Sequence, residues 1–563
     1  MRTAFTFAIL LFFFFASAQH NPYPQQYYRH PLNIKMELVS NFGELRTNHW
    51  HMGLDIRTQQ RENLPVYAAA DGYIAQVSVS PGGFGRAIYI NHPNGQTTLY
   101  AHLNNFEPKL HQWVIDQQYA QQSWAIRLDL PPSLFPVKKG DLIAYSGNTG
   151  GSQGPHVHFE IRDTETTKCL NPLLFGFPIP DGVPPSLTRL ALYDRNKNVY
   201  AQTPQLLALS KPGANYTLAS GSTLKVGSNR VSFALGAVDR FTGVANPNGI
   251  YSARIEMDGV LQSQFILDSI DYNETRYMNA HIDYRYKAVG GPYLQHLSRM
   301  PGDTTRVYTR TPTDGVLELN DTDVHDVVIT VQDAAFNTSR LTFKVQYNEA
   351  QAKAYTPAEE QLVPLEVNVF ERDGFELYTT EYTVYDTVNI TYKEALSAAA
   401  ASPLYTFASH TIPVHDSVTV RIKVDNVTPE DRNKIIIRNV AGTRTTVTKG
   451  DWNDGWVTAK FRQFGTFQAF VDKTPPVINA PGSGSVIDLS RASRIVFTPT
   501  DNFKELKNFR AELDGQWLLF TNDKGRSHIY RFDKYFTPGT HTLTVSVEDE
   551  AGNITTRSWQ VRR

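Results

Sequence analysis

Four short sequence blocks occur twice in the chain in the same order, and this repeat constrains the fold of the C-terminal half. The blocks are DGVPPSL, VSFALGAVDRF, RIEMDG and ITVQDAAFNTSR within residues 181–340, and DKTPPVI, IVFTPTDNF, RAELDG and VSVEDEAGNITTR within residues 472–557. Matched blocks in a fixed order predict two copies of one structural unit. Their short alternating runs, bounded by Gly, Pro, Asn and Asp, favour β-sandwiches. The first copy is expected to carry an insertion around residues 262–316.

The last block of each copy places Asp-x-Ala-x-Asn between two strand-like runs, at Asp333 to Asn337 and at Asp549 to Asn553. This pattern resembles the closing hairpin of bacterial immunoglobulin-like domains. Asp and Asn suit a tight turn because their side chains bond to nearby backbone groups. We favour this turn role over calcium ligation.

The rest of the chain also has the composition and pattern of sheet proteins. Its 563 residues correspond to about four domains, and its 28 Tyr and 31 Phe favour strands. The sequence therefore predicts an all-β protein: an N-terminal antiparallel β domain followed by three Ig-like β-sandwich modules. We name these the N-terminal domain (32–180, with an insertion at about 107–136), the first module (181–348), the middle module (349–471) and the last module (472–563).

The first residues have the pattern of a secretory signal peptide. Arg2 precedes the apolar run from Ala4 to Phe15, and Ala16-Ser17-Ala18 matches a cleavage site. We expect a signal peptide over residues 1–18, export to the periplasm or the cell exterior and envelope, and no membrane span after cleavage. The chain has one cysteine, Cys169, which excludes an internal disulfide and any Cys-rich zinc cluster.

The formal charge is balanced, with 54 Lys and Arg against 55 Asp and Glu. A nucleic-acid-binding protein normally carries a basic excess or stripe, so we expect no nucleic-acid partner. With a single cysteine, any bound metal must be held by His and carboxylate side chains.

Potential ligands of this kind concentrate in the N-terminal domain. His51 and Asp55 lie four residues apart with Gly53 between them, and GPHVHFEIR follows at residues 154–162. On a strand, His156, His158 and Glu160 share one face, because alternate residues point the same way. Two histidines beside another His–Asp pair form a ligand set suited to catalytic zinc. His49 is a weaker alternative to His51, and Glu160 is expected to support a ligand.

The segments HMGLDI, YAHL, GDLIAYSGNTG and GPHVHFEIRD occur in this order and together resemble the LytM/lysostaphin-type zinc endopeptidases, of the duplicated hybrid motif superfamily. The resemblance covers about residues 40–175. It implies one zinc ion per catalytic domain, held by His51, Asp55 and His158, with His102 and His156 as the catalytic histidines. The insertion at 107–136 is expected to wall or cover part of the substrate groove.

The resemblance implies an exported peptidase that hydrolyses peptide cross-links of bacterial peptidoglycan with metal-activated water. Either His102 or His156 is expected to act as the base. One alternative is a catalytically silent activator of cell-wall amidases, and another is a wall-binding or adhesive protein. The intact ligand set argues against the silent activator. The β-sandwich modules are expected to act as spacers or to bind the wall or a cell-envelope protein.

Overall fold

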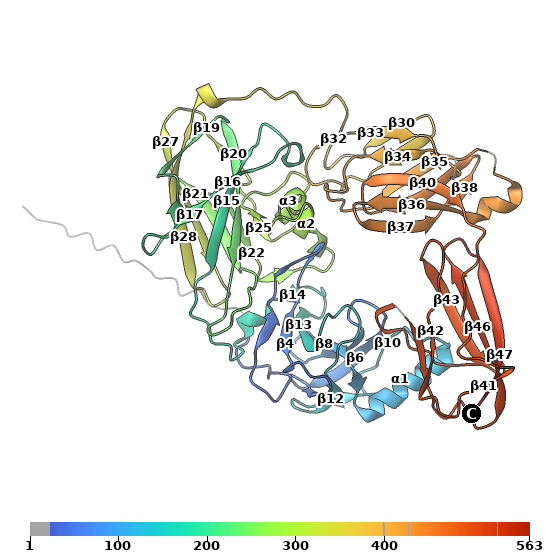
Figure 1. Cartoon of the computed structure of the whole chain (residues 1–563). Coiled ribbons are helices and arrows are strands. Elements are labelled where there is room, and N and C mark those ends of the chain that lie inside the picture. Colours follow the sequence, from blue (N-terminus) through green and yellow to red (C-terminus); the bar gives the residue numbers. More distant parts are fainter. Residues whose placement is uncertain (1–22, 398–399, 426, 526) are drawn as a thin grey trace, which may run out of the picture.

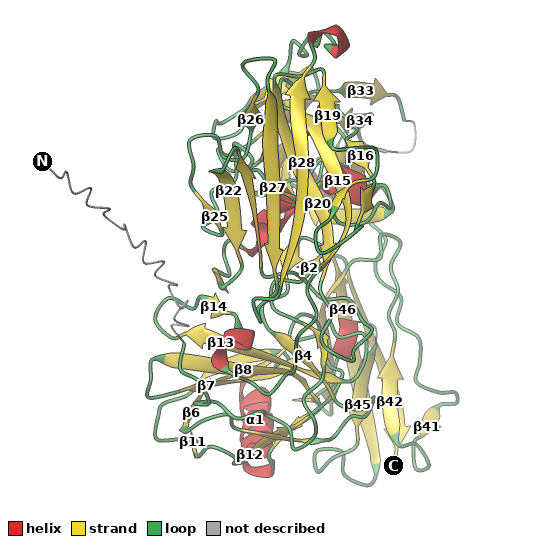
Figure 2. Ribbon diagram, turned by 90° about the vertical axis from the view of Figure 1, so that its left-hand side faces the viewer, coloured by secondary structure: helices red, strands yellow, loops and turns green. Residues whose placement is uncertain are grey.

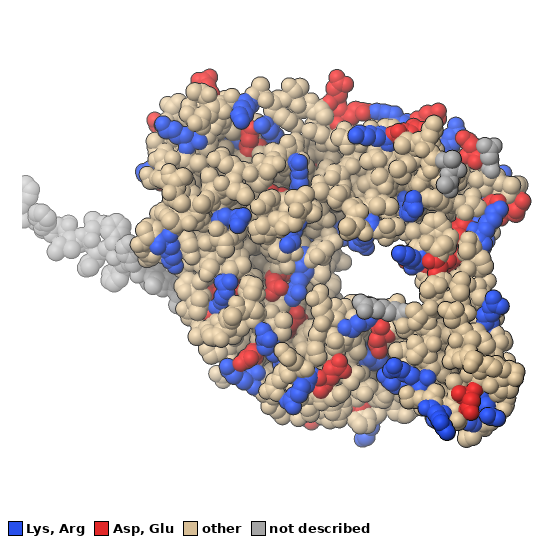
Figure 3. Space-filling view, in the orientation of Figure 1, with Lys and Arg blue, Asp and Glu red and all other residues tan. Residues whose placement is uncertain are grey.

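The protein consists of β-rich bodies arranged in a ring (Figure 1), and the computed structural model describes residues 23–397, 400–425, 427–525 and 527–563. About 43% of the chain is strand and 8% is helix, so the all-β prediction is confirmed. The N-terminal domain contacts both the first and the last module, and the middle module connects these two (Figure 1). Figure 3 shows an opening through the ring. The predicted signal peptide lies outside the described residues.

A twisted antiparallel sheet forms the N-terminal domain, with central strand order β1-β4-β13-β8-β7-β6-β10. A smaller sheet has the order β5-β12-β9, and β2 pairs with β3. The short strands β11 and β14 pair with β6 and β13 at the margins. The bounds are β1 Leu38–Ser40, β2 Leu45–Arg46, β3 His49–Trp50, β4 Leu54–Arg57, β5 Pro65–Tyr67, β6 Gly72–Val79, β7 Arg86–Asn91, β8 Gln96–Leu103, β9 Asn105–Phe106, β10 Ile126–Asp129, β11 Pro136–Val137, β12 Leu142–Tyr145, β13 His156–Asp163 and β14 Cys169–Leu170.

The hairpin expected around Asn94 and Gly95 joins β7 to β8. Gly95 has a φ of 78°, a left-handed conformation that glycine adopts without steric cost. This hairpin extends the sheet beside β13, so the strand that carries the two clustered histidines lies in the middle of the sheet and not at its edge.

The insertion contains a helix that the sequence analysis did not predict. Helix α1 (Pro108–Gln121) begins after Glu107, whose carboxylate accepts hydrogen bonds from the backbone N–H groups of Lys109 and Leu110. Proline at the first helical position fits this start because its missing N–H would have no helical partner there. Along the buried side, Leu110 and Val114 are followed four residues later by the polar Gln118, which interrupts the apolar pattern.

The first and last modules contain sheets with the same strand order. The order is β19-β28-β27-β21-β22-β25 in the first module and β41-β47-β46-β43-β44 in the last. In both, the outermost first pair is parallel and the following pairs are antiparallel. The bounds are β19 Thr223–Val226, β21 Ser252–Met257, β22 Val260–Ile266, β25 Tyr308–Thr309, β27 Val324–Gln332, β28 Thr338–Tyr347, β41 Val486–Asp488, β43 Leu506–Leu513, β44 Gln516–Trp517, β46 Thr540–Asp549 and β47 Ile554–Arg562.

A second sheet completes each of these modules (Figure 2). In the first module its order is β16-β15-β20-β24, with β26 also on β20, and in the last module β42 pairs with β45. The predicted insertion of the first module includes β23, β24, β25 and two short helices. The bounds are β15 Ser186–Asp194, β16 Gln205–Leu207, β17 Leu209–Ser210, β18 Thr217–Leu218, β20 Arg230–Val238, β23 Ser269–Ile270, α2 Met278–His281, α3 Tyr284–Ala288, β24 Gln295–His296, β26 Leu317–Glu318, β42 Arg494–Phe497 and β45 His528–Arg531.

The middle module has two five-stranded sheets, β30-β31-β35-β39-β38 and β33-β34-β40-β36-β37, together with the pair β29-β32. The domain boundaries and the Ig-like assignment of the modules stay predictions. The bounds are β29 Gln361–Leu362, β30 Val369–Arg372, β31 Phe375–Tyr378, β32 Val388–Asn389, β33 Tyr392–Ala395, β34 Leu404–Phe407, β35 Val418–Lys423, β36 Ile435–Ala441, β37 Arg444–Lys449, β38 Asp451–Asn453, β39 Trp456–Phe461 and β40 Gly465–Val471.

One apolar cluster continues from the N-terminal domain through the first module into the middle module, and it includes Trp50, Phe265 and Phe375. The last module has a separate core around Phe497 and Tyr530. The first module is therefore fused to the N-terminal domain by shared packing, whereas the last module docks as a separate body. Within the described residues, no helix combines the length and hydrophobicity that crossing a membrane requires.

Candidate metal centre

Strand β13 places two histidines beside Asp55 because it lies between β4 and β8. His158 pairs with Asp55 of β4 on one side and with Ala101 of β8 on the other. His156 and His158 lie on one face of the strand, and Val157 between them is fully buried in the core on the other face. The sheet register therefore brings the two separate sequence motifs together.

His102 joins this site through an irregularity in β8. The register between β7 and β8 shifts there, so Ala101 and His102 together oppose Ala87. His102 has a φ of 58°, in the left-handed region that residues other than glycine seldom adopt. Its ring centroid lies 4.7 Å from that of His156 and 5.9 Å from that of His158. A regular strand would turn His102 away from this face, and a bulge of this kind redirects the side chain.

Three potential ligand atoms from His51, Asp55 and His158 converge in the buried part of the site. His51 Nε2 lies 3.0 Å from Asp55 Oδ1 and 3.0 Å from His158 Nδ1. His158 Nδ1 lies 2.9 Å from Asp55 Oδ1. Two imidazole nitrogens and one carboxylate oxygen therefore form a compact triangle, and these are donor types that zinc prefers.

The partners of the outer ring nitrogens determine whether the inner nitrogens carry a proton or a lone pair. His51 Nδ1 lies 2.7 Å from the carbonyl oxygen of Asn41, which can only accept a hydrogen bond. His158 Nε2 lies 2.8 Å from Glu160 Oε1. In the neutral rings the protons are thus on these outer nitrogens, and the lone pairs of His51 Nε2 and His158 Nδ1 face Asp55. With both rings neutral, three electron-pair donors face one another without a proton between them, which is the arrangement that a cation fits.

The pKa values in the metal-free protein agree with a site built for positive charge. Burial opposes the charged form of His158, but hydrogen bonds to Asp55 and Glu160 outweigh burial and raise the pKa of His158 to about 9. Burial also opposes ionisation of Asp55, but His51 and the other two histidines hold the pKa of this carboxyl well below its usual range. A metal ion would replace the proton on His158.

Glu160 connects His158 to a buried cation. Its Oε2 accepts a hydrogen bond of 2.6 Å from Arg162 Nε, and the carboxylate is fully buried. The Arg162 guanidinium lies 4.6 Å from the centre of the Tyr272 ring, which belongs to the first module. Cys169 is also buried here, with Sγ 3.4 Å from Glu160 Oε2. The expected supporting role of Glu160 is thus visible as a contact to His158.

His102 and His156 are held by backbone carbonyls on the other side of the site. His102 Nδ1 lies 2.9 Å from the carbonyl oxygen of Thr149, and His156 Nδ1 lies 2.8 Å from that of Gly154. His156 Nε2 lies 3.3 Å from Asp55 Oδ1. Burial and the two neighbouring histidines lower the pKa of His102 to about 3. The carbonyl contacts therefore hold both rings through Nδ1, and the Nε2 of His156 faces Asp55.

The other histidines considered in the sequence lie outside the donor triangle. His49 is exposed, and its Nδ1 lies 2.9 Å from the carbonyl oxygen of Thr47. His92 is buried between the Asp71 carbonyl and the Thr98 hydroxyl. The structure thus places His51, not His49, beside Asp55.

Three further residues lie around the centre, and two of them, Phe84 and Tyr272, were not identified from the sequence. Arg46 Nη2 lies 3.3 Å from Asp55 Oδ2, so it contacts the outer oxygen of a ligand. The Phe84 ring lies 5.5 Å from that of His158, between centroids. Tyr272 comes from the first module, across the strand pair β14–β23. No local sequence pattern reveals a contact that depends on how two domains pack.

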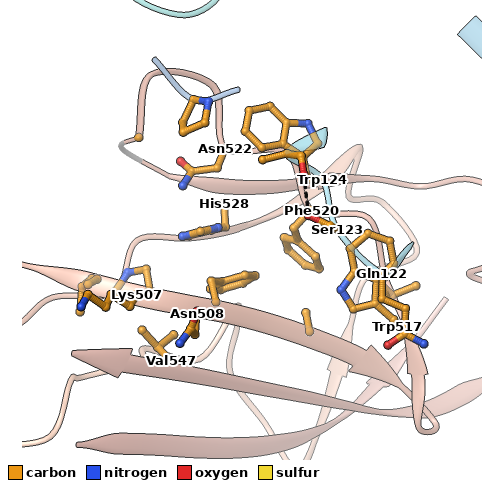
Figure 4. Close-up of a pocket in the computed structure, with 18 residues that line it drawn as sticks. Gln122, Ser123, Trp124, Lys507, Asn508, Trp517, Phe520, Asn522, His528 and Val547 are labelled. Atoms are coloured by element: carbon orange, nitrogen blue, oxygen red, sulfur yellow. Dashed lines mark hydrogen bonds between the residues drawn. The ribbon is translucent and has the colours of Figure 1, made fainter. Parts of the chain in front are cut away.

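The insertion provides the docking surface for the last module, which qualifies the expectation that it walls the substrate groove. Tyr119 of α1 stacks on Tyr535 with 3.9 Å between ring centroids, and its hydroxyl donates to Asp533 over 2.9 Å. A cavity of about 470 Å³ remains between the two bodies, with Trp124 on one side and His528 on the other (Figure 4).

The last module also touches the loop that holds His156. Lys524 Nζ donates to the carbonyl oxygen of Ser152 over 2.7 Å and to Asn148 Oδ1 over 3.2 Å. The Ser152 hydroxyl in turn lies 3.2 Å from His156 Nδ1. The first and last modules therefore border the centre from two sides.

Comparison with known families gives two matches along the chain. Residues 49–119 and 135–172 match Peptidase family M23, and residues 359–472 match the Zu5-like domain. The stretch that separates the two M23 segments falls inside the predicted insertion. The Zu5-like match covers most of the middle module.

Several curated proteins are similar to the N-terminal domain. The DD-carboxypeptidase/endopeptidase Mpg of Neisseria meningitidis serogroup B is 34% identical over 137 residues, 24% of this chain and 25% of that protein. An uncharacterized metalloprotease of Haemophilus influenzae is 31% identical over 156 residues, 27% of each chain. The peptidoglycan DD-endopeptidase ShyA of Vibrio cholerae is 26% identical over 162 residues, 28% of this chain and 31% of the other. The chain thus spans about a quarter of the length of the first two of these relatives.

Two solved structures also match part of this chain. The catalytic domain of lysostaphin from Staphylococcus simulans is 22% identical, with 25% of this chain and 91% of that chain covered and a TM-score of 0.19. A zinc-containing peptidase from Vibrio cholerae is 26% identical, with 24% and 37% covered and a TM-score of 0.18.

Proposed function

We propose that this chain, whose N-terminal domain is an M23 peptidase domain, is an exported zinc-dependent endopeptidase. Its proposed reaction is hydrolysis of the peptide cross-links of bacterial peptidoglycan. The observation that carries the proposal is the convergence of His51 Nε2, Asp55 Oδ1 and His158 Nδ1 with lone pairs facing inward. The relatives named as peptidoglycan or DD-endopeptidases support the substrate class.

The residues present fit a zinc ion, with His51, Asp55 and His158 as its protein ligands. Two neutral rings and one carboxylate leave the site with a net positive charge when zinc is bound. Zinc supplies a Lewis acid there, which makes water more acidic and polarises a peptide carbonyl. Glu160 fixes the ring of His158 in the orientation in which Nδ1 is the ligand atom.

His102 and His156 are proposed to carry the protons of the reaction. Each ring contacts a backbone carbonyl through Nδ1, so a neutral ring carries its proton there and its lone pair on Nε2. In the metal-free protein the Nε2 of His156 faces Asp55. One ring can accept a proton from the attacking water, and the same proton can then pass to the leaving amine. The other ring, when protonated, can donate a hydrogen bond to the carbonyl oxygen as negative charge develops on it. Both rings share the backbone contact through Nδ1, so either can act as the base, and only His156 also contacts Asp55.

The first and last modules are proposed to restrict access to the centre. Tyr272 of the first module lies beside Glu160, which contacts His158. Lys524 of the last module bonds to Ser152, which contacts His156. We propose that the modules also keep the peptidase domain at a fixed distance from the cell envelope or from a partner in it.

The alternative of a silent amidase activator or adhesive protein is less well supported, because all five site positions carry the residues that catalysis requires. The test is zinc content and peptide release from purified peptidoglycan, with wild type beside His158→Ala. We expect one zinc per wild-type chain with peptide release, and loss of both in the variant. Stoichiometric zinc in the wild type without peptide release, on walls of several cross-link types, would favour the silent alternative.

A further inference from the structure

Two groups of three aspartates occupy matching positions in the first and last modules. The groups are Asp181, Asp239 and Asp333, and Asp472, Asp501 and Asp549. In each group, one carboxylate oxygen from every residue lies within 4.8 Å of the others. The members come from the same three repeated blocks, so the duplicated sequence has placed three carboxylates together twice.

Two members of each group have a structural role in turns and leading segments. In the first module, Asp333 Oδ1 accepts hydrogen bonds of 2.9 Å from the backbone N–H groups of Ala335 and Asn337. Asp549 accepts the equivalent bond of 2.8 Å from Asn553. Asp181 and Asp472 lie in the segments that lead into the two modules. The turn role predicted for the Asp-x-Ala-x-Asn pattern therefore holds, but it does not involve the third carboxylate.

The third carboxylate of each group has an oxygen without a protein partner. Asp239 is 2% exposed, and its Oδ1 has no hydrogen-bond partner among the described residues. In the last module the corresponding Asp501 Oδ1 is also buried and without such a partner. An unpaired buried carboxylate oxygen is costly, so its recurrence at the same position in both copies requires an explanation.

A neutral oxygen accompanies the group in the first module. Asn248 forms an antiparallel bridge with Asp239 through two backbone hydrogen bonds of 3.0 and 2.9 Å. Residues paired in this way direct their side chains to the same face, with Cβ atoms about 5.5 Å apart. Asn248 is 4% exposed, and its Oδ1 likewise has no partner among the described residues. Two paired residues of this face therefore each carry a buried oxygen, one amide and one carboxylate, without a donor among the described residues.

The described basic side chains form no ion pair with these carboxylates, although Arg240 partly offsets the charge of Asp239. None of the six carboxylates forms an ion pair with a described Lys, Arg or His within 4.0 Å. Burial and the neighbouring carboxylates of Asp333 and Asp181 raise the pKa of Asp239 to about 7. Burial likewise raises the pKa of Asp333 to about 6. Crowded carboxylate and amide oxygens without nitrogen or sulfur donors suit a hard divalent cation, above all Ca²⁺.

We infer that each aspartate triad binds one Ca²⁺ ion, so the chain carries two calcium sites that are separate from the peptidase centre. In both copies the ion joins the segment that leads into the module to the end of a core strand and to the closing hairpin turn. Asp181 follows the N-terminal domain and Asp472 follows the middle module. Calcium would therefore stiffen two junctions of the ring, and so fix the first and last modules around the peptidase domain.

The direct test is equilibrium dialysis of the zinc-loaded full chain against radioactive calcium. We expect two ions per chain, with affinities in the range of about 0.1–1 mM that extracellular calcium modules show. Asp239→Asn and Asp501→Asn should each remove one ion, and the double variant both. The control is Asp323→Asn, which replaces an exposed aspartate of the first module. This variant should still bind two ions. A wild type that binds no calcium up to 10-fold above this range would overturn the inference, as would variants that still bind two ions.

A second measurement distinguishes ligation from a purely structural role. Asp239→Asn removes one of three crowded negative charges, so we expect a higher melting temperature than wild type in the absence of calcium. Calcium should raise the melting temperature of the wild type. The part of this increase that comes from the site in the first module should be absent in Asp239→Asn. A melting temperature that falls equally with and without calcium would mean that Asp239 is only structural. Magnesium in place of calcium is expected to bind at least 10-fold more weakly, because it requires a tighter octahedral set of ligands.

Discussion

Glu160 Oε1 lies 2.8 Å from His158 Nε2, and this buried contact determines which nitrogen of His158 faces the metal centre. The contact joins two residues of one strand face, so the local sequence His-x-Glu is sufficient to form it. Arg162, two residues further along the same face, then holds Glu160 in its ionised form. A single strand thus supplies a proposed catalytic histidine, a proposed ligand and the groups that orient this ligand.

Glu160→Ala should weaken zinc binding without removing a ligand. Loss of the carboxylate frees His158 to rotate or to change tautomer, and loss of such partners typically costs about 10–100-fold in metal affinity. Glu160→Gln is the matched control, because its amide oxygen still accepts the proton of His158 Nε2, and it should lose less. Competition with a chromophoric chelator measures the effect. Equal zinc affinity in wild type and Glu160→Ala would show that this contact does not orient the ligand.

His102→Ala should retain zinc and lose activity. The side chain contacts the ring of His156 but is not one of the three converging donors, and loss of a general acid or base typically lowers the rate by about 10²–10⁴-fold. His49→Ala serves as the comparison, since this exposed histidine should be dispensable for both zinc content and peptide release. Loss of zinc from the His102 variant would mean that His102 is a ligand.

Tyr119→Ala should release the last module from the peptidase domain. The ring stacks on Tyr535 and also meets Trp517 edge-on at 5.4 Å, and each aromatic pair contributes about 0.5–1.5 kcal/mol beyond area burial. Tyr119→Phe keeps both ring contacts and loses only the bond to Asp533, so it should stay docked. Small-angle scattering should show a larger radius of gyration for the alanine variant alone. An unchanged radius would mean that other contacts suffice for docking.

Calcium should raise the melting temperature more at pH 8 than at pH 5.5. The pKa values of Asp239, about 7, and Asp333, about 6, lie above the ordinary value of 3.8, and burial is the main cause for both. Neighbouring carboxylates also raise the pKa of Asp239, against an opposing effect of Arg240. Asp181 also raises the pKa of Asp333. The folded calcium-free protein therefore holds these protons more tightly than the unfolded chain does. The stability that these protons give the folded protein is complete below about pH 4 and is lost as the pH rises through 6 to 7.

At pH 8 the calcium-free triad is thus ionised and destabilising, and Ca²⁺ meets no competing proton. At pH 5.5 protons occupy part of the site and reduce the effect of calcium. Thermal denaturation with and without calcium at the two pH values measures the difference. A calcium shift that is equal at both values, or larger at pH 5.5, would contradict this account.

Much of the centre is predictable from the sequence because strand geometry is simple. Alternation along GPHVHFEIR is enough to put His156, His158 and Glu160 on one face, and the Asn94–Gly95 turn is enough to predict its hairpin. The repeated blocks likewise predict related topology, and the two sheets do share their strand order. These inferences depend on patterns within about ten residues of chain.

Features that depend on irregular backbone or on packing between domains were not predictable in this way. His102 faces the site only because β8 bulges, and its left-handed φ has no signature in YAHL. Helix α1 was missed because Gln118 interrupts its apolar face. Tyr272 reaches Arg162 across a domain boundary, more than a hundred residues away in the sequence.

The most direct test of the central claim is release of peptides from purified peptidoglycan by the metal-free protein, before and after one equivalent of zinc is added. Zinc bound by His51, Asp55 and His158 should restore release from background to the level of the untreated enzyme, while His158→Ala stays at background at the same zinc concentration. Full activity in the metal-free protein, or equal restoration in the His158 variant, would contradict the account.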